Sequence, residues 1–312
     1  MKEEKKMKKI VTLIMVAIML CTSVFALASC GEDGLDAAYN KYIKEYTFND
    51  KDLPTLTVAT SPDFAPMEFV DAAKSGQEQY VGFDIILAHY LAKELNMKLE
   101  IKPMSFDACM VAVQTGQADL AISGFSWTPV RAENFLISDW YKAGENETEQ
   151  IIITTKANEG KFTTKESFSG MKIGAQGSSL QETLVKENFV DTGIASISQY
   201  VNLDDALTDL ISGKIDALAV AAGNGDAFIS KNPDKVATSG FQFDVEEKYK
   251  NNVILLNKTN NELLEKVNAA LGKAKEANLY GPWYEACQIY SEIKTADKLG
   301  YDDKGNKITS AE

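Results

Sequence analysis

Residues 120–131 read Leu-Ala-Ile-Ser-Gly-Phe-Ser-Trp-Thr-Pro-Val-Arg, an apolar run followed by a turn of small residues and the start of a helix. The apolar run predicts the end of a buried strand, and Thr128 followed by Pro129 predicts an N-cap and the first helical position. Arg131 is the only arginine among the 32 lysine and arginine residues of the chain. A guanidinium group grips a carboxylate or phosphate through two parallel hydrogen bonds, and a helix N-terminus favours anions. We therefore expect Arg131 to bind an anionic group rather than to form a surface ion pair.

Predicted strands and helices alternate on both sides of this stretch. Strands are expected at residues 56–60, 98–101, 118–122, 151–155, 170–175, 216–220 and 252–257, and helices at 82–95, 107–113, 180–188, 203–212 and 260–277. This alternation is typical of an α/β fold with crossover connections. Ligands of open α/β sheets bind beyond the carboxyl ends of the strands. The loops that carry Phe64, Phe106 and residues 123–131 fall at or soon after such ends.

The chain contains an internal repeat that predicts two similarly built lobes. Residues 113–122 (Val-Gln-Thr-Gly-Gln-Ala-Asp-Leu-Ala-Ile) resemble residues 210–219 (Leu-Ile-Ser-Gly-Lys-Ile-Asp-Ala-Leu-Ala). Each segment predicts a helix end, a glycine stop, an aspartate and a buried strand. The length of the mature chain also favours two domains.

The N-terminus predicts export and a lipid anchor. Lysines among residues 2–9 precede an apolar core, residues 10–20, and residues 27–30 (Leu-Ala-Ser-Cys) resemble the cleavage site of bacterial prolipoproteins. Residues 1–29 are therefore interpreted as a lipoprotein signal peptide, with Cys30 as the lipidated residue; an ordinary signal peptide is the alternative. We expect an extracytoplasmic protein anchored to the cell membrane. Residues 30–53 are predicted to be a tether and residues 291–312 a flexible tail.

Charge and composition exclude several classes of function. Removing residues 1–29 takes away five lysines and two glutamates, so the net charge moves from −13 to −16, which argues against nucleic acid as a partner. With His89 as the one histidine, neither a zinc site nor Ser-His or Cys-His catalysis is supported, and no metal or cofactor is predicted. Cys109 and Cys287 are expected to be buried free thiols, although a bridge between them remains an alternative.

A series of short motifs resembles a known family. In order, these are residues 61–69 (Ser-Pro-Asp-Phe-Ala-Pro-Met-Glu-Phe), 81–84 (Val-Gly-Phe-Asp), 106–107 (Phe-Asp), 116–119 (Gly-Gln-Ala-Asp), 123–131, 174–178 (Gly-Ala-Gln-Gly-Ser) and 213–216 (Gly-Lys-Ile-Asp). Together they resemble family 3 of the bacterial extracellular solute-binding proteins, the polar amino-acid-binding proteins of ABC importers. The resemblance covers about residues 54–290.

The resemblance implies a two-lobe, periplasmic-binding-protein-like fold of type II with two hinge crossovers. Lobe 1 would comprise residues 54–145 and 252–290, and lobe 2 residues 146–251. Hinge closure would bury the ligand in the cleft between them. The implied function is a receptor that catalyses nothing, captures an amino acid or a similar carboxylate and delivers it to an ABC permease. The alternatives are an exported enzyme on the same scaffold, similar to cyclohexadienyl dehydratases, with Glu68 or Asp226 as general acid, and a ligand-sensing domain.

The same resemblance implies roles for individual residues. Arg131 would hold the ligand carboxylate, Phe64 and Phe106 would enclose its side chain, and Ser123 with the Gly124 carbonyl would hold its ammonium group. The full set of expected ligand contacts is Phe64, Phe106, Ser123, Gly124, Ser126, Arg131, Gln176, Gly177, Ser178, Ser179 and Asp226. Ser179 could instead be only a helix cap that forms a capping box with Glu182, and Phe106 could belong to the core. Phe125 and Trp127 are expected to pack.

One position departs from the family pattern. Ala221 stands where the family usually has an aspartate that pairs with the ligand ammonium, and Ser61 also replaces an aspartate found in many members. An unpaired buried ammonium is costly. Either Asp226, expected in a flexible loop after residues 223–225, supplies the charge, or the ligand is not a standard α-amino acid.

Overall fold

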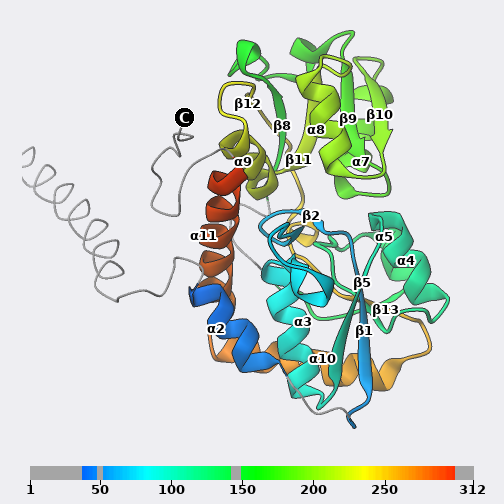
Figure 1. Cartoon of the computed structure of the whole chain (residues 1–312). Helices are drawn as coiled ribbons and strands as arrows, with labels where there is room; N and C mark the ends of the chain where they lie inside the picture. Colours follow the sequence, from blue (N-terminus) through cyan, green and yellow to red (C-terminus); the bar gives the residue numbers. More distant parts are fainter. Residues whose placement is uncertain (1–36, 48–51, 142–148, 299–312) are drawn as a thin grey trace, which may run out of the picture.

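The computed structural model describes residues 37–47, 52–141 and 149–298, which form two lobes, one above the other in Figure 1. The predicted signal peptide, Cys30 and residues 299–312 of the predicted tail lie outside these residues. So does the stretch 142–148, where the first hinge crossover is expected.

Lobe 1 is built on a five-stranded sheet in the order β5-β1-β6-β13-β7. The strands are β1 (Thr55–Thr60), β5 (Lys98–Pro103), β6 (Leu120–Ala121), β7 (Leu136–Ile137) and β13 (Leu255–Leu256). Strand β1 pairs in parallel with β5 and β6, whereas β13 runs antiparallel to β6 and β7. The helices of this lobe are α3 (Phe83–Glu94), α4 (Phe106–Gln114), α5 (Pro129–Asn134), α10 (Asn261–Glu276) and α11 (Tyr280–Lys298). A small antiparallel sheet adds β2 (Asp63–Phe64), β3 (Glu68–Val70) and β4 (Tyr80–Val81).

Lobe 2 has a second five-stranded sheet, in the order β10-β9-β11-β8-β12. Its strands are β8 (Gln150–Thr155), β9 (Lys172–Gln176), β10 (Ser196–Tyr200), β11 (Ala217–Ala221) and β12 (Val236–Gln242). Its helices are α7 (Leu180–Val185), which continues as a π-helical turn through Lys186–Val190, α8 (Leu203–Ile211) and α9 (Ala222–Lys231). Short 3₁₀ turns lie at Gly76–Gln79 in lobe 1, at Lys156–Asn158 and Lys165–Phe168 in lobe 2, and at Glu247–Tyr249 on the return to lobe 1.

Strand β13 completes the sheet of lobe 1 from a segment that follows lobe 2 in the chain. Just before β13, Asn252 pairs with both Ser126 and Tyr141, so the returning chain lies beside the segment that leaves lobe 1. Each sheet therefore combines parallel and antiparallel pairing. The strand that enters from the other lobe, β13 in lobe 1 and β8 in lobe 2, runs antiparallel to the strands beside it.

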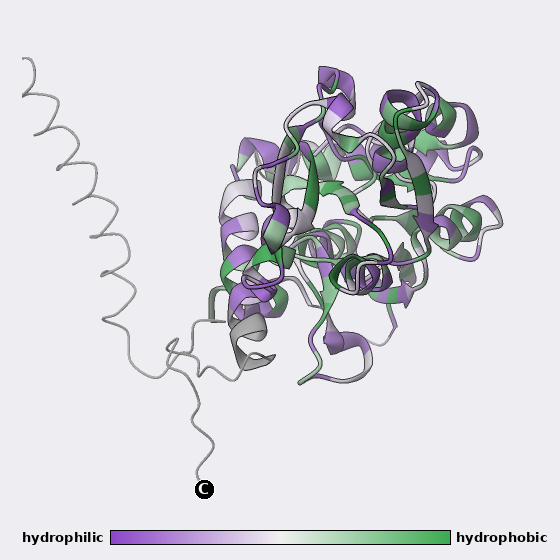
Figure 2. Ribbon diagram, turned by 90° about the horizontal axis from the view of Figure 1, so that it is seen from above, coloured by the Kyte–Doolittle hydropathy of each residue, from purple (hydrophilic) through white to green (hydrophobic). Residues whose placement is uncertain are grey.

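Each lobe has its own buried core. The sheet of lobe 1 packs with α3, α10 and α11 on one set of apolar residues and with α4 on another, and the sheet of lobe 2 is likewise packed on two sets. All five residues of β11 are buried, as expected for a central strand covered on both faces. Figure 2 shows the hydrophobic segments inside the molecule and hydrophilic ones on the outer helices.

The expectation of a tether over residues 30–53 is wrong for residues 37–46. They form helix α2 (Ala37–Tyr46), which packs on lobe 1 beside α3 and α11 (Figure 1). Tyr39 is 1% exposed, its ring lies 4.4 Å from that of Tyr290, and its hydroxyl accepts a hydrogen bond from the Gly82 amide at 3.1 Å. Tyr46 meets Trp283 edge to face at 5.7 Å. These aromatic contacts make α2 part of the lobe 1 core.

Two further expectations change. Helix α11 continues to Lys298 and Ser291 on it is buried, so the predicted tail does not begin at residue 291. Residues 223–225 are not a loop but the first turn of α9. A side chain at Gly225 would put its Cβ 2.8 Å from the Ile151 side chain, so glycine permits close packing of α9 on the sheet.

Cys109 on α4 and Cys287 on α11 are both buried and free, which confirms the expectation of unpaired thiols. Among the described residues, no helix is both long enough and apolar enough to cross a membrane.

Candidate functional site

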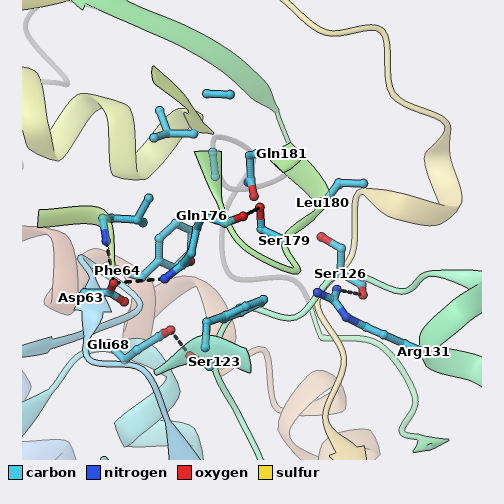
Figure 3. A pocket seen from close by; sticks show the side chains of 16 residues that line it. Asp63, Phe64, Glu68, Ser123, Ser126, Arg131, Gln176, Ser179, Leu180 and Gln181 are labelled. Atoms are coloured by element: carbon cyan, nitrogen blue, oxygen red, sulfur yellow. Dashed lines mark hydrogen bonds between the residues drawn. The ribbon is translucent and has the colours of Figure 1, made fainter. Parts of the chain in front are cut away.

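A cavity lies between the two lobes, and Figure 3 shows its lining side chains. Lobe 1 contributes Asp63, Phe64, Glu68, Phe106, Ser123, Gly124, Ser126 and Arg131, and lobe 2 contributes Gln176, Ser179, Leu180, Gln181, Leu203, Ala219, Val220 and Ala221. Its volume is about 30 Å³, which is room for a water molecule or two but not for an amino acid. The lobes are therefore closed on each other, and a larger ligand enters only if they separate.

Arg131 reaches the cavity from the first turn of α5. The Thr128 hydroxyl accepts a hydrogen bond from the Arg131 amide at 3.2 Å, so the predicted N-cap is confirmed. The guanidinium donates to the Ser126 carbonyl at 2.6 Å through Nη1 and to the Ser178 carbonyl of lobe 2 at 2.9 Å through Nη2. Arg131 is 5% exposed, and burial lowers its pKa to about 10. No ion pair to Arg131 is found within the described residues, so its positive charge is met only by neutral groups.

Aromatic rings support this cation and line the cavity. The guanidinium carbon lies 5.5 Å from the ring centre of Phe106 and 5.1 Å from that of Phe125. Phe106 and Phe125 stack at 4.5 Å, so Phe106 both lines the cavity and belongs to the core, while Phe125 is packed as expected. Phe64 is half-buried and packs against the cores of both lobes. Gly124 has φ +55°, and a Cβ there would lie 2.9 Å from the Phe64 ring, so only glycine leaves room for this ring.

Asp63 joins the two lobes directly. Its Oδ2 accepts from the Leu203 amide at 2.8 Å and from the Gln176 side-chain amide at 3.1 Å, both in lobe 2 (Figure 3). Its Oδ1 accepts from the Ser61 hydroxyl at 2.9 Å. Burial raises the pKa of Asp63, and these hydrogen bonds oppose the rise because they favour the ionised form. Asp63 is thus a carboxylate in the cavity wall with three donors around it.

Glu68 forms a second acidic group in the wall, next to Ser123. The Ser123 hydroxyl donates to Glu68 Oε1 at 2.6 Å and accepts from the Ser61 amide at 3.0 Å. Burial, with the neighbouring Asp84 carboxylate, raises the pKa of Glu68 well above its usual range. Asp84 accepts from the Gly124 amide at 2.8 Å and from the Tyr141 hydroxyl at 2.9 Å, and burial raises its pKa to about 6. Of the two carboxyl groups, Glu68 is the one held in the neutral form near neutral pH.

In lobe 2, Ser178 and Ser179 of the expected anion site already make hydrogen bonds with neighbouring residues of the same lobe. The Ser179 hydroxyl accepts from the Glu182 amide at 3.1 Å and donates to the Gln176 carbonyl at 2.7 Å, so it caps α7 as well as lining the cavity. The Ser178 amide donates to the Glu182 carboxylate at 2.5 Å, a variant of the predicted capping box. Ser178 and Gly177 lie beside the cavity rather than in its lining, and Ser178 takes part through its carbonyl, which faces Arg131.

Asp226 is not placed where the sequence analysis expected it. It is exposed on α9 and does not line the cavity, whereas Ala221, at the end of β11, does. Helix α9 begins directly after β11, at Ala222, and Asp226 lies on its second turn, so the helix carries Asp226 away from the strand end that reaches the cavity. The part of the cavity lining formed by Ala219, Val220 and Ala221 is therefore apolar.

Asp63 was not predicted as a cavity residue, and Glu68 was predicted only as a general acid of the alternative enzyme. Leu180, Gln181, Leu203, Ala219 and Val220 were also not predicted, whereas Ala221 was expected at the site as the position of the missing aspartate. A signal for Asp63 was present, since it directly precedes Phe64 in the proline-rich loop, but nothing in the local pattern showed which lobe it would meet. Glu68 and Asp63 lie on β3 and β2, which pair with each other, and this brings both acids to the same wall.

The arrangement suits binding of a small polar molecule. One cationic group and two carboxyl groups line a closed, partly aromatic space, which favours a ligand that carries both a carboxylate and cationic groups. Within the described residues no cluster of three or more His, Cys, Asp or Glu side chains could hold a metal ion.

Comparison with protein families gives one match over most of the chain. The model of the bacterial extracellular solute-binding proteins, family 3, matches residues 56–286. The arginine-binding extracellular protein ArtP of Bacillus subtilis (strain 168) is 27% identical over 271 residues, which cover 86% of this chain and 94% of that protein. The histidine-binding periplasmic protein of Escherichia coli (strain K12) is 29% identical over 230 residues, 72% of this chain and 84% of that protein.

Solved structures include similar proteins. The amino acid ABC transporter substrate-binding protein AbpA of Streptococcus pneumoniae, bound to L-arginine, is 33% identical with a TM-score of 0.69. The match covers 77% of this chain and 96% of the AbpA chain.

Proposed function

Because the chain belongs to the bacterial extracellular solute-binding proteins, family 3, we propose that its ligand is a basic amino acid of the arginine type. The chain is an amino-acid-binding protein and not an enzyme. Its relatives include proteins named for arginine and for histidine, both amino acids with a cationic or titratable side chain. The choice among amino acids rests on the charges of the cavity.

The observation that carries the proposal is the joint presence of Arg131, Asp63 and Glu68 in one closed cavity. A basic amino acid has one carboxylate and two cationic groups. Its carboxylate would meet Arg131, and its two cationic groups would meet the two acids, which leaves no charge uncompensated. Because an unpaired charge is costly once water is excluded, this balance favours a basic ligand over a neutral one.

Closure would couple binding to recognition by a permease. Phe64, Asp63 and Arg131 already touch lobe 2 in the closed form, so these contacts and the ligand would be enclosed together. The closed form would present a continuous surface across the two lobes that an open form would lack. A membrane-bound ABC permease would receive the ligand from that closed form, as expected for a family of extracellular solute-binding proteins.

Cys30 would anchor the receptor to the membrane by a lipid. Replacing Cys30 with serine should move the protein from the membrane fraction to the soluble exported fraction. Incorporation of labelled palmitate, present in the unchanged protein and absent from Cys30→Ser, would report the lipid directly. Equal membrane association of the two proteins would count against the anchor.

The ligand is tested with the purified body of the protein, residues 37–298, so that the anchor does not interfere. Arginine, lysine, histidine, citrulline and glutamine would be compared by thermal unfolding and calorimetry. A ligand at about one hundred times its Kd stabilises the folded state by roughly 2.7 kcal/mol. We expect arginine or lysine to raise the melting temperature most, and citrulline, the neutral analogue of arginine, to bind more weakly. Tighter binding of citrulline than of arginine would refute the choice of a basic ligand.

A further inference from the structure

One oxygen of the buried Glu68 carboxyl group, Oε2, accepts no hydrogen bond from an N–H or hydroxyl group of the described residues. In the described part of the chain, four buried side-chain atoms have no hydrogen-bond partner, and Glu68 Oε2 is the one that belongs to a cavity-lining residue. Glu68 is 1% exposed, and its other oxygen, Oε1, is held by Ser123. As a neutral acid, Glu68 shares its proton with the neighbouring Asp84 carboxyl group. No N–H or hydroxyl group of the described residues donates to Oε2, so an ammonium group that arrives with a ligand would supply a donor there once Glu68 ionises.

The remaining wall offers few other partners for a ligand cation. Ala219, Val220 and Ala221 present no charge from lobe 2. Asp63 already accepts three hydrogen bonds, from Ser61, Gln176 and Leu203. Glu68 lies beside Ser123 and Gly124, the residues expected to hold the ligand ammonium, and it belongs to the same lobe as Arg131.

We propose that Glu68 is the counter-ion of the ligand α-ammonium group, and that it takes this role from lobe 1 because the lobe 2 wall at Ala221 is apolar. The inference rests on the proposed function, since it needs a ligand with an α-ammonium group. It assigns Arg131 to one end of the amino-acid head and Glu68 to the other. Ser123 holds the Glu68 carboxyl in place through Oε1 and leaves Oε2 for the ammonium.

Binding in this way releases a proton. In the free protein burial and the Asp84 charge keep Glu68 as a neutral acid, because both raise its pKa. The other titratable groups around it are Asp63, Cys109 and Tyr141, and burial raises the pKa of each. An arriving ammonium favours the ionised form, so the Glu68 carboxylic acid loses its proton to solvent and an ion pair forms with the unchanged ammonium. Near neutral pH we expect up to one proton released per ligand bound.

The test compares Glu68→Gln with the unchanged protein, using L-arginine and its des-amino analogue as probes. Titrations in buffers of different ionisation enthalpy also give the number of protons released. Glutamine keeps the size and the Ser123 contact but loses the charge. We expect the affinity for arginine to fall roughly 10- to 100-fold, which is the loss of one buried hydrogen bond to a charged group. Binding of the des-amino analogue should not change, and the proton release should disappear.

Two further variants make the result decisive. Glu100→Gln, an equal change at an exposed position on β5, should leave arginine binding and proton release unchanged. Ala221→Asp in the Glu68→Gln background returns a carboxylate to the cavity from lobe 2, and it should recover part of the arginine affinity. Equal losses for arginine and its des-amino analogue, or unchanged arginine affinity in Glu68→Gln, would overturn the assignment while the receptor function stands. Failure of the unchanged protein to bind any α-amino acid would instead refute the proposed function and this assignment together.

Discussion

Replacing Arg131 with alanine separates the binding role of this residue from its structural role. The guanidinium makes two hydrogen bonds to carbonyl groups and lies against two rings. It has no carboxylate partner within the described residues, although it is 5% exposed. A buried cation of this kind is expected to contribute little to folding and much to binding an anion.

The magnitudes follow from the structure. Burial lowers the pKa of Arg131 from 12.5 to about 10, which corresponds to a cost of about 3 kcal/mol for the charged form. Two hydrogen bonds from a charged donor return about 3 kcal/mol or somewhat more. The two contributions nearly cancel, so Arg131→Ala should change the free energy of unfolding of the ligand-free protein by no more than about 1–2 kcal/mol. Loss of a buried charge pair with a ligand carboxylate costs about 2–5 kcal/mol, which is a drop in affinity of roughly 30-fold to several thousandfold.

Calorimetry would measure the affinity for arginine, and urea unfolding would measure the stability of the ligand-free protein. Arg131→Lys serves as the matched variant, since it keeps the positive charge but not the two-pronged donor. We expect it to retain part of the binding that alanine loses. The reasoning is refuted if Arg131→Ala binds arginine within threefold of the unchanged protein, or if it loses more than about 4 kcal/mol of stability, because Arg131 would then be a structural residue.

Three other predictions follow from separate parts of the molecule. Asp63→Ala removes the acceptor of the Gln176 and Leu203 hydrogen bonds, so the ligand-free protein should expand in small-angle X-ray scattering and bind its ligand more weakly; an unchanged radius of gyration would show that Asp63 does not hold the lobes closed. Tyr39→Ala should cost about 3–5 kcal/mol in urea unfolding, as for other large buried rings, whereas a helix that served only as a tether would give no change. Burial raises the pKa of Asp84 from 3.8 to about 6, so its folded-state pKa lies above the unfolded value and its contribution to stability falls as pH rises between about 4 and 6. Between pH 4 and pH 6 the unchanged protein should therefore lose about 3 kcal/mol of stability relative to Asp84→Asn. A stability difference that does not change with pH would contradict a raised pKa of the buried Asp84.

Local patterns were sufficient for the elements around Arg131. The Thr128 cap, Pro129 at the first helical position and the alternation of strands and helices were all predicted and are found, because a cap or an apolar period is set by residues within one or two turns. The burial and free state of Cys109 and Cys287 were also expected from their apolar neighbours. Helix α2 was underestimated, since its polar composition concealed a stripe of tyrosines that packs on α11.

The positions of Asp226 and Glu68 relative to the cavity could not be predicted from local patterns. Asp226 was expected to face the ligand because it follows β11 closely in the chain, but one turn of α9 directs it to solvent. Glu68 reached the cavity through the pairing of β2 with β3 and through Ser123, which is 55 positions away. Neither result depends on residues close enough in sequence to leave a local pattern.

The sequence itself determined three features: Arg131, the helix start on which it lies, and the two similar lobes. Helix propensity, capping and repeated apolar runs set them. Closure of the lobes was decided only by the tertiary structure. The hydrogen bonds from Asp63 to Gln176 and Leu203 span 113 and 140 positions, and the one from Arg131 to Ser178 spans 47. The physical reason is that these bonds require two separately folded lobes to meet at a particular orientation, and hinge geometry, rather than any local preference of the chain, sets that orientation.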